Sequence, residues 1–267
     1  MGLLLCRWLC DNSAVRKTAS SSSPFLPLAV APPTRLSILL DAAPVSLDDP
    51  RSHWSPTEAS PHLRMVGGAC VCRDQVEQSS DAVRAAHGIK AGLHVWEVLW
   101  EPGQRGSHAL IGISTNKGPR QASGYKALVG GDSCSWGWEL STNQLWHSGK
   151  EVGPYPTGPG RPLEVPGHVL VVVDADAGTL GYAVDEFYLG VAFEGLPKGV
   201  ELFPTISCVW GGARIYLRYI NGASRDPPAL ACLCRLGVRQ ALGRDREALT
   251  DRLPLPPILQ RLLLPKS

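Results

Sequence analysis

The side chains that most often carry out catalysis occur in this chain, but they do not form a set. The seven histidines are scattered, and His94 and His147 lie within apolar and aromatic runs, which favours core or strand-edge positions over a role as general base. Asp174 and Asp176 could pair for acid–base chemistry, yet the spacing Asp-x-Asp-x-Gly is also typical of a hairpin turn. No G-x-S-x-G motif or phosphate-binding glycine loop occurs. We therefore expect no catalytic residues and no cofactor.

Cysteine is the other residue type that could do chemistry. Two of the eight form the pair Cys70 and Cys72, and two form the pair Cys232 and Cys234. A zinc site requires closely spaced ligand pairs or nearby histidines, and these two pairs are far apart with no histidine cluster. We expect no metal site and reduced, mostly buried thiols. The remaining cysteines are Cys6, Cys10, Cys134 and Cys208.

The stretch around Trp136-Gly137-Trp138 indicates the centre of the fold. Side chains of a strand alternate between its two faces, so both tryptophans belong on one face. The glycine between them leaves the opposite face thin, which suits a close backbone approach. Trp146 follows after turn residues and starts a second short strand. Together these residues predict a β-sandwich core.

Further strands are predicted by apolar alternation or short apolar runs between glycine- and proline-rich turns. The segments are Leu93–Trp100, Ala109–Ile113, Val169–Val173, Thr179–Val184, Tyr188–Phe193, Leu202–Ser207 and Arg214–Tyr219. Many short strands at close spacing are typical of an antiparallel sandwich. We therefore predict a mostly β fold followed by a small all-α region.

Composition limits where the protein acts and what it binds. The net charge of +2 provides no field for nucleic-acid binding, and no apolar run is long enough to cross a membrane. Residues 1–33 predict a disordered leader. Residues 13–35 are rich in serine and proline with basic residues and no acid, so a transit peptide is the weaker alternative. We expect a cytoplasmic protein.

Helical spacing appears on both sides of the strand region. Leu36, Leu39 and Leu40 follow the i, i+3, i+4 pattern of a short amphipathic helix. The spacing of apolar residues over 229–242 predicts a second helix, with Pro227 and Pro228 at its entry and Gly243 at its end. Beyond it we expect an extended proline segment, and then a short apolar helix at Ile258 to Leu264.

Four motifs together resemble the SPRY-domain and SOCS-box protein family. They are His94-Val95-Trp96-Glu97-Val98, Ser135-Trp136-Gly137-Trp138, the run from Asp174 to Phe193, and Tyr219-Ile220-Asn221-Gly222, joined to a leucine-rich tail. The resemblance implies a SPRY-type antiparallel β-sandwich and a SOCS box. The domains would be a leader at 1–33, an N-terminal extension at 34–62, the SPRY domain at 63–222 and the SOCS box at 223–267.

The resemblance assigns the tail to two partners. An elongin-binding helix at 227–243 would present a leucine, a cysteine four residues later and an aliphatic residue four further, which forms one apolar stripe for a groove. The residues for elongin B/C are Leu230, Leu233, Cys234 and Val238. A cullin box at 253–264 would contact cullin-5 and its RING protein. Its residues are Leu253, Pro254, Leu255 and Pro256, and Leu262 stands where the family has tyrosine.

The resemblance also implies a peptide site on the SPRY loops, which would take short peptides of the form D/E-I/L-N-N-N. Carried over by local match, its residues are Arg73, Gln75, Glu77, Tyr125, Leu128, Val209, Trp210 and Gly211. Arg73 is expected to meet the acidic residue, Trp210 and Val209 to wall the aliphatic one, and Tyr125 to donate to an amide. Gln75 and Glu77 depart from the family, which has proline and alanine there. A carboxylate at position 77 disfavours an acidic peptide.

These expectations favour a non-catalytic substrate-recognition subunit of a cullin-5 RING ubiquitin ligase, which promotes ubiquitination and proteasomal degradation by proximity alone. A peptide-binding scaffold whose tail only caps the sandwich stays open as an alternative, and co-purification of elongin B/C distinguishes the two. A carbohydrate-binding sandwich is a third possibility. It requires secretion, and the sequence shows no signal peptide.

Overall fold

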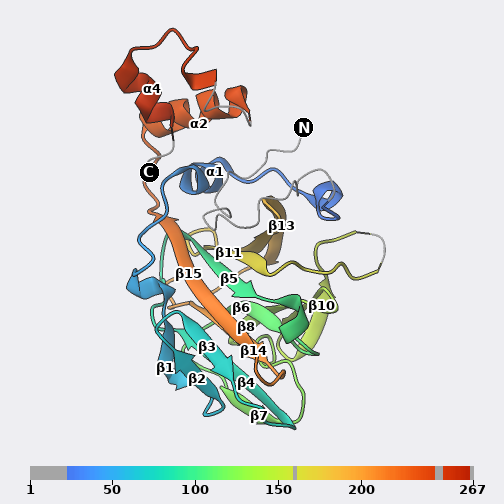
Figure 1. Cartoon of the computed structure of the whole chain (residues 1–267). Helices are drawn as coiled ribbons and strands as arrows, with labels where there is room; N and C mark the ends of the chain where they lie inside the picture. The colour runs from blue at the N-terminus through green and yellow to red at the C-terminus, as the bar shows by residue number, and fades with distance from the viewer. Residues whose placement is uncertain (1–22, 159–160, 244–248, 265–267) are drawn as a thin grey trace.

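The computed structural model describes residues 23–158, 161–243 and 249–264, and in these the fold is two antiparallel sheets with helices at one end (Figure 1). The first sheet runs in the order β1 (Trp54–Ala59), β4 (Ser79–Ala85), β14 (Phe203–Cys208), β6 (Leu110–Ser114), β8 (Ser135–Glu139), β9 (Gln144–His147) and β10 (Lys150–Pro154), with β7 (Gln121–Ser123) paired to β4. The predicted antiparallel sandwich is confirmed.

The second sheet faces the first across the core. Its order is β13 (Phe187–Glu194), β12 (Thr179–Val184), β11 (His168–Asp174), β5 (Leu93–Trp100), β15 (Arg214–Ala223), β3 (Cys70–Arg73) and β2 (Leu63–Val66). The short 3-10 helices are η1 (Leu26–Leu28), η2 (Pro50–Ser52) and η3 (Pro102–Gln104). The α-helices are α1 (Thr34–Asp41), α2 (Leu230–Leu242) and α4 (Pro257–Leu263).

Tryptophans fill the space between the sheets, and each fully buried indole has a hydrogen-bond acceptor. Trp138 packs on Tyr182 with ring centroids 5.0 Å apart and donates to the carbonyl of Tyr155 at 2.9 Å. Trp54, Trp96 and Trp100 likewise donate to backbone carbonyls. A buried N–H that has an acceptor avoids a desolvation cost, so these large rings stabilise the core without a polar penalty.

The glycine between Trp136 and Trp138 has the role that the sequence predicts. Both rings belong to the core between the sheets, and Gly137 is paired across the ladder with Gly112. A Cβ atom on Gly137 would lie 2.7 Å from the Val129 carbonyl oxygen, and one on Gly112 would lie 1.8 Å from that of Trp136. Only glycine permits this approach of backbones.

Helix α1 forms as predicted and covers the outer face of the second sheet. Leu36, Leu39 and Leu40 are buried there in a cluster with Val95 of β5 and Leu170 of β11. Side chains of these strands alternate, so the neighbouring residues of both strands point into the main core. The second sheet is therefore apolar on both faces.

The predicted leader at 1–33 is wrong for its last part, while residues 1–22 lie outside the described residues. Phe25 is buried in the main core, and the amide of Val30 donates to the carbonyl of Tyr188 on β13 at 2.8 Å. The serines and prolines of the leader follow no helix or strand period, so the sequence did not reveal Phe25 as an anchor. The predicted extension at 34–62 also includes β1, whose pairing with β4 makes it a strand of the first sheet.

The tail is helical as predicted, but α2 begins at Leu230 and not at Pro227. A residue before proline is disfavoured in the helical region, so Pro227 stays extended ahead of Pro228. Gly243 ends the helix with φ of +67°, as expected. Cys234 is exposed, unlike the buried thiols of the sandwich. No helix in the described part of the chain is long and apolar enough to cross a membrane.

Candidate functional site

Three loops come together at one end of the sandwich, and we call residues 74–78, 124–128 and 209–212 the loop surface. The amide of Gly212 donates to the carbonyl of Arg73 at 2.8 Å, which joins the first loop to the third. The amide of Gly124 donates to the carbonyl of Gln78 at 2.8 Å, which joins the first to the second. The sequence-predicted peptide residues, scattered between positions 73 and 211, are thus brought together.

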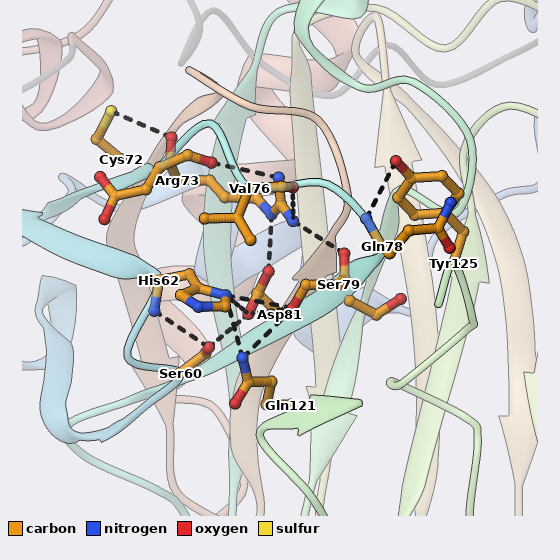
Figure 2. Close-up of polar contacts among 12 residues, drawn as sticks. Ser60, His62, Cys72, Arg73, Val76, Gln78, Ser79, Asp81, Gln121 and Tyr125 are labelled. Atoms are coloured by element: carbon orange, nitrogen blue, oxygen red, sulfur yellow. Dashed lines mark hydrogen bonds and ion pairs between the residues drawn. The ribbon is translucent and has the colours of Figure 1, made fainter. Parts of the chain in front are cut away.

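Two aromatic rings of the loop surface face solvent. Trp210 is 50% exposed and Tyr125 is 44% exposed, whereas Leu128 and Val209 of the same loops are buried. The Tyr125 hydroxyl accepts a hydrogen bond from the amide of Gln78 at 3.3 Å (Figure 2). Exposed aromatic rings are typical of binding surfaces, because burial of the rings by a ligand is favourable.

Close contact between loops depends on two glycines. A Cβ atom on Gly211 would lie 2.9 Å from the Cα of Gln75, so the first and third loops touch through backbone. Gly106, with φ of +62°, lies under Trp210, and a Cβ there would be 3.0 Å from the indole Cε3. Sequence reasoning missed Gly106. Its only sequence signal is a glycine within the polar loop after β5.

Arg105 holds that loop in place from inside. Its guanidinium is buried and donates to the backbone carbonyls of Trp100, Val165 and Pro166. Burial lowers the pKa of Arg105 to about 10, since desolvation disfavours the charged form. The segment that supports Trp210 is therefore anchored to the sandwich and is not a loose loop.

Arg73 does not face solvent, which corrects the direct ligand contact expected from the sequence. Its side chain is fully buried and its Nε lies 2.8 Å from Oδ2 of Asp81. The other guanidinium nitrogens donate to the carbonyls of Asp74 and Val76 in the first loop and of Ser79 at the start of β4 (Figure 2). Arg73 therefore fixes the backbone path of the loop that carries Gln75 and Glu77.

Asp81 is the centre of this network, and sequence reasoning missed it. Besides Arg73, its carboxylate accepts from the hydroxyls of Ser60 at 2.5 Å and Ser79 at 3.2 Å, and lies 3.1 Å from Nδ1 of His62. Gln121 of β7 contacts the same nitrogen at 3.0 Å. Strand β4 also contains Ser79, Ser80 and Arg84, so its composition does not show that Asp81 is buried. A buried acid needs partners, and only the folded chain supplies them.

Few unpaired charges remain on the loop surface. Glu77 and Lys126 are exposed, while Asp74 is paired with Arg64 at 2.6 Å. The charge of Arg73 is offset by Asp81 inside the protein. The electrostatic preference of this surface is therefore set by one carboxylate and one ammonium group.

In the tail, α2 has two opposite faces. Leu236 and Arg239 are buried, and Arg239 is paired with Asp41 of α1, the helix that lies between the tail and the sandwich (Figure 1). The four residues that the sequence predicts for elongin lie on the other face, and all four are exposed, Leu230 by 75%. An apolar stripe left in water on a helix of this length indicates a missing partner.

The proline segment directly precedes α4. Leu253 and Leu255 are half-buried, and Pro254 and Pro256 are exposed. The side-chain amide of Gln260 donates to the carbonyl of Leu253 at 3.1 Å, which fixes the segment against α4. On α4, Leu263 is buried, whereas Ile258 is 79% exposed. This helix also offers apolar side chains to solvent.

The catalytic and metal candidates fit structural roles. Asp174 and Asp176 form the predicted β11–β12 turn and are both paired with Arg35. His94 is largely buried and contacts the Tyr219 hydroxyl at 2.8 Å, and burial lowers its pKa. Among the described residues no three His, Cys, Asp or Glu side chains are arranged to hold a metal ion.

Comparison with known proteins covers nearly the whole chain. Residues 93–215 match the SPRY domain and residues 226–264 match the SOCS box. The rat SPRY domain-containing SOCS box protein 2 is 43% identical over 263 residues, 96% of this chain and 99% of the relative. The human SPRY domain-containing SOCS box protein 1 is 44% identical over 239 residues, 87% of each chain. Protein gustavus of Drosophila melanogaster is 39% identical over 243 residues, 88% of this chain and 87% of the relative.

A sandwich with exposed aromatics at its loops and a tail with an exposed apolar stripe thus coincide with the two matched domains. A SOCS box implies binding of elongin B/C and a cullin in general, and the combination points to an adaptor and not to a catalytic subunit. The chain belongs to the family of SPRY domain-containing SOCS box proteins, whose two domains together are those of a substrate-recognition adaptor of cullin-RING ligases.

Proposed function

We propose that this protein is the substrate-recognition adaptor of a cullin-5 RING ubiquitin ligase in the cytoplasm. The loop surface holds a target through a short D/E-I/L-N-N-N-like peptide, and the exposed face of α2 binds elongin B/C. The cullin and its RING protein then bring a charged ubiquitin-conjugating enzyme near the target. This chain supplies proximity and no chemistry, which is sufficient because positioning alone accelerates transfer.

The observation that carries the proposal is the division of α2 into two faces. The face with Leu236 and Arg239 is already used inside the chain. The face with Leu230, Leu233 and Val238 has the spacing of a helix that enters an apolar groove. A tail that only capped the sandwich would bury its leucines there, and the most apolar positions of α2 do the opposite.

The cullin contact is supported by the segment beyond α2. Pro254 and Pro256 stand exposed beside α4, and Leu262 of α4 is also exposed, in the place where the family has tyrosine. Leucine keeps the apolar contact but lacks a hydroxyl. We therefore expect cullin-5 to bind at this site with one hydrogen bond fewer, a loss of about 0.5–1.5 kcal/mol.

The peptide site is supported by the chemistry that the loop surface exposes. Trp210 and Tyr125 offer apolar rings for an aliphatic residue, and the side-chain amides of Gln75 and Gln78 suit asparagines. Arg73 takes part indirectly, because it holds the backbone of the first loop. The cation available to an acidic peptide residue is Lys126, and Glu77 opposes it.

Co-purification with elongin B/C tests the proposal. The full chain should retain elongin B/C, and the double variant Leu230→Pro, Cys234→Phe should lose it while the sandwich stays folded. Proline costs about 3 kcal/mol in a helix interior, and phenylalanine overfills the groove by about 1–3 kcal/mol. Leu47→Ser is the matched control, since Leu47 is 67% exposed outside the tail. Equal retention by the double variant would overturn the adaptor function.

The alternative, a peptide-binding scaffold without ligase recruitment, makes the opposite prediction in the same experiment. Peptide would bind to the loop surface, while elongin B/C would not co-purify with the wild-type chain. The exposed α2 face favours the adaptor, because a scaffold has no use for four apolar side chains in water.

A further inference from the structure

Helix α1 lies between the sandwich and the tail helices (Figure 1). Its leucines pack on the outer face of the second sheet, and its last residue, Asp41, contacts α2. The sequence marks α1 only as a short amphipathic helix. The structure shows that its two ends are tied to different domains by charged groups.

On the sandwich side, Arg35 joins three segments. Its Nη2 atom lies 3.0 Å from Oδ2 of Asp176 in the β11–β12 turn and donates to the carbonyls of Ala223 and Ser224 at 2.8 and 2.5 Å. The Gly92 amide and Arg35 lower the pKa of Asp176, which keeps the carboxylate charged. Arg35 thereby fixes the point at which the chain leaves β15 for the tail.

On the tail side, one buried carboxylate holds two arginines. The Asp41 side chain is 2% exposed, and its Oδ2 lies 2.9 Å from Nη1 of Arg239 and 3.4 Å from Nε of Arg235. The same Nη1 of Arg239 donates to the Asp41 backbone carbonyl at 3.2 Å. Buried ion pairs add little net stability, but removing one partner is costly, so they select one arrangement over others.

The covalent connection cannot fix that arrangement by itself. Residues 224–229 link β15 to α2 and are all exposed. Their side chains contribute a local bond between Ser224 and Asp226. Pro227 and Pro228 keep part of this connector extended, and the torsions of the other residues still spread its ends over on the order of 10 Å. The orientation of the elongin-binding face must therefore come from contacts with α1.

We propose that Asp41 is a positioning residue that couples the two domains. Through Arg239 and Arg235 it holds α2 so that the face with Leu230 points away from the sandwich, at a set distance and angle from the loop surface. The functional consequence rests on the proposed adaptor function: target and conjugating enzyme meet in one geometry, and a restricted set of target lysines is modified.

The test measures the distance distribution between the two domains in the full chain. Spin labels are placed through unnatural residues at Lys150 on β10 and Gln240 on α2, both exposed. The wild-type chain should give one narrow distribution. Asp41→Ala should broaden it by on the order of 10 Å, the range of a free connector. Asp48→Ala, an exposed acid in the same N-terminal segment, should leave it narrow.

A second variant controls for the possibility that Asp41→Ala disrupts α1 itself. Arg239→Ala removes the contact from the tail side and leaves every sandwich residue unchanged, so it should broaden the distribution in the same way. Peptide affinity at the loop surface and elongin B/C affinity should both stay within about twofold of wild type, because neither binding face changes. In the assembled ligase, both variants should modify a wider set of lysines on a bound target.

Narrow, wild-type distributions in Asp41→Ala and Arg239→Ala would overturn the coupling, whatever elongin B/C does. Broadened distributions with an unchanged lysine pattern would overturn its role in transfer. If the variants broaden the distribution but the wild-type chain fails to bind elongin B/C, the coupling stands and the adaptor function fails. The two proposals are thus separable.

Discussion

The sandwich and the tail use the same apolar residue types in opposite ways. In the sandwich, Trp96, Trp100 and Trp138 are fully buried and their indole N–H groups have acceptors. In the tail, Leu230 and Ile258 stand in water. The sandwich therefore buries its own apolar side chains, whereas the tail leaves an apolar face exposed, as expected of a surface that a partner protein covers.

The loop surface is the part of the sandwich that, like the tail, exposes large apolar side chains to solvent. Trp210 is half exposed, while the tryptophans of the core are almost without exposure. Its ring rests on Gly106, and the loop beneath is anchored by Arg105. An exposed ring on a rigid support loses little conformational entropy on binding, so the proposed peptide site would need little ordering to take a ligand.

The largest expected effect is on the stability of the sandwich core. Trp138→Ala should lower the free energy of unfolding by about 3–5 kcal/mol, and Trp136→Ala by a similar amount, because each opens a cavity in the core. Chemical denaturation with tryptophan fluorescence measures both. Trp210→Ala is the matched control and should stay within about 0.5 kcal/mol of wild type. Near-wild-type values for Trp136→Ala and Trp138→Ala would mean that the core lies elsewhere.

In the tail, we expect a substitution on the exposed face of α2 to weaken partner binding and to leave stability unchanged. Leu230→Ser should weaken elongin B/C binding by about 2–4 kcal/mol, the range of an interface hot spot, and leave the free energy of unfolding within about 0.5 kcal/mol. Calorimetric titration and denaturation of the same sample give the two numbers. Leu47→Ser should change neither of them. A loss of stability in Leu230→Ser with unchanged binding would reverse the assignment of the two faces.

The sequence alone predicts the regions where local pattern and tertiary structure agree. Alternation predicts β5, the Trp-Gly-Trp step predicts the glycine approach in β8, and helical spacing predicts α1 and α2. It also predicts which face of α2 carries Leu230, because that face follows from residue spacing. These are properties of neighbouring residues, and no distant partner is needed to infer them.

Long-range polar partners could not be predicted in this way. Arg73 has the charge expected of a ligand contact, and only the folded chain shows that Asp81 already binds it. The Asp41–Arg239 pair joins residues 198 positions apart. Phe25 in a serine- and proline-rich segment gives no periodic signal. Burial at these positions depends on which segments meet, and composition does not record that.

Trp210→Ala tests whether the exposed ring of the loop surface serves binding and not stability, as we propose for the exposed leucines of the tail. We expect affinity for a D-I-N-N-N peptide to fall by about 2 kcal/mol, because the aliphatic residue loses its aromatic wall. The melting temperature should not change, since the ring is half exposed. Val152→Ala, at an exposed apolar site on β10, is the control. Unchanged affinity in Trp210→Ala would place the peptide site elsewhere on the sandwich.

The smallest expected effect concerns which target the loop surface prefers. Glu77 is exposed and Arg73 is paired with Asp81 inside the protein, so the exposed cation within the loop surface is Lys126. A carboxylate at a screened surface opposes an acidic ligand by about 1 kcal/mol. The wild-type chain should therefore bind D-I-N-N-N more weakly than its Asp→Asn or Asp→Lys forms.

Glu77→Ala should strengthen binding of the acidic peptide by up to about tenfold and abolish the preference for the other two forms. Raised salt should shrink the difference between Glu77→Ala and wild type, because screening weakens repulsion between exposed charges. Glu151→Ala, an exposed acid on β10, is the matched control and should change no affinity. Calorimetry with the three peptides measures every value. If Glu77→Ala leaves the ranking unchanged while Trp210→Ala weakens all three peptides, the peptide binds to the loop surface with its first residue away from Glu77, and Lys126 does not set the charge preference.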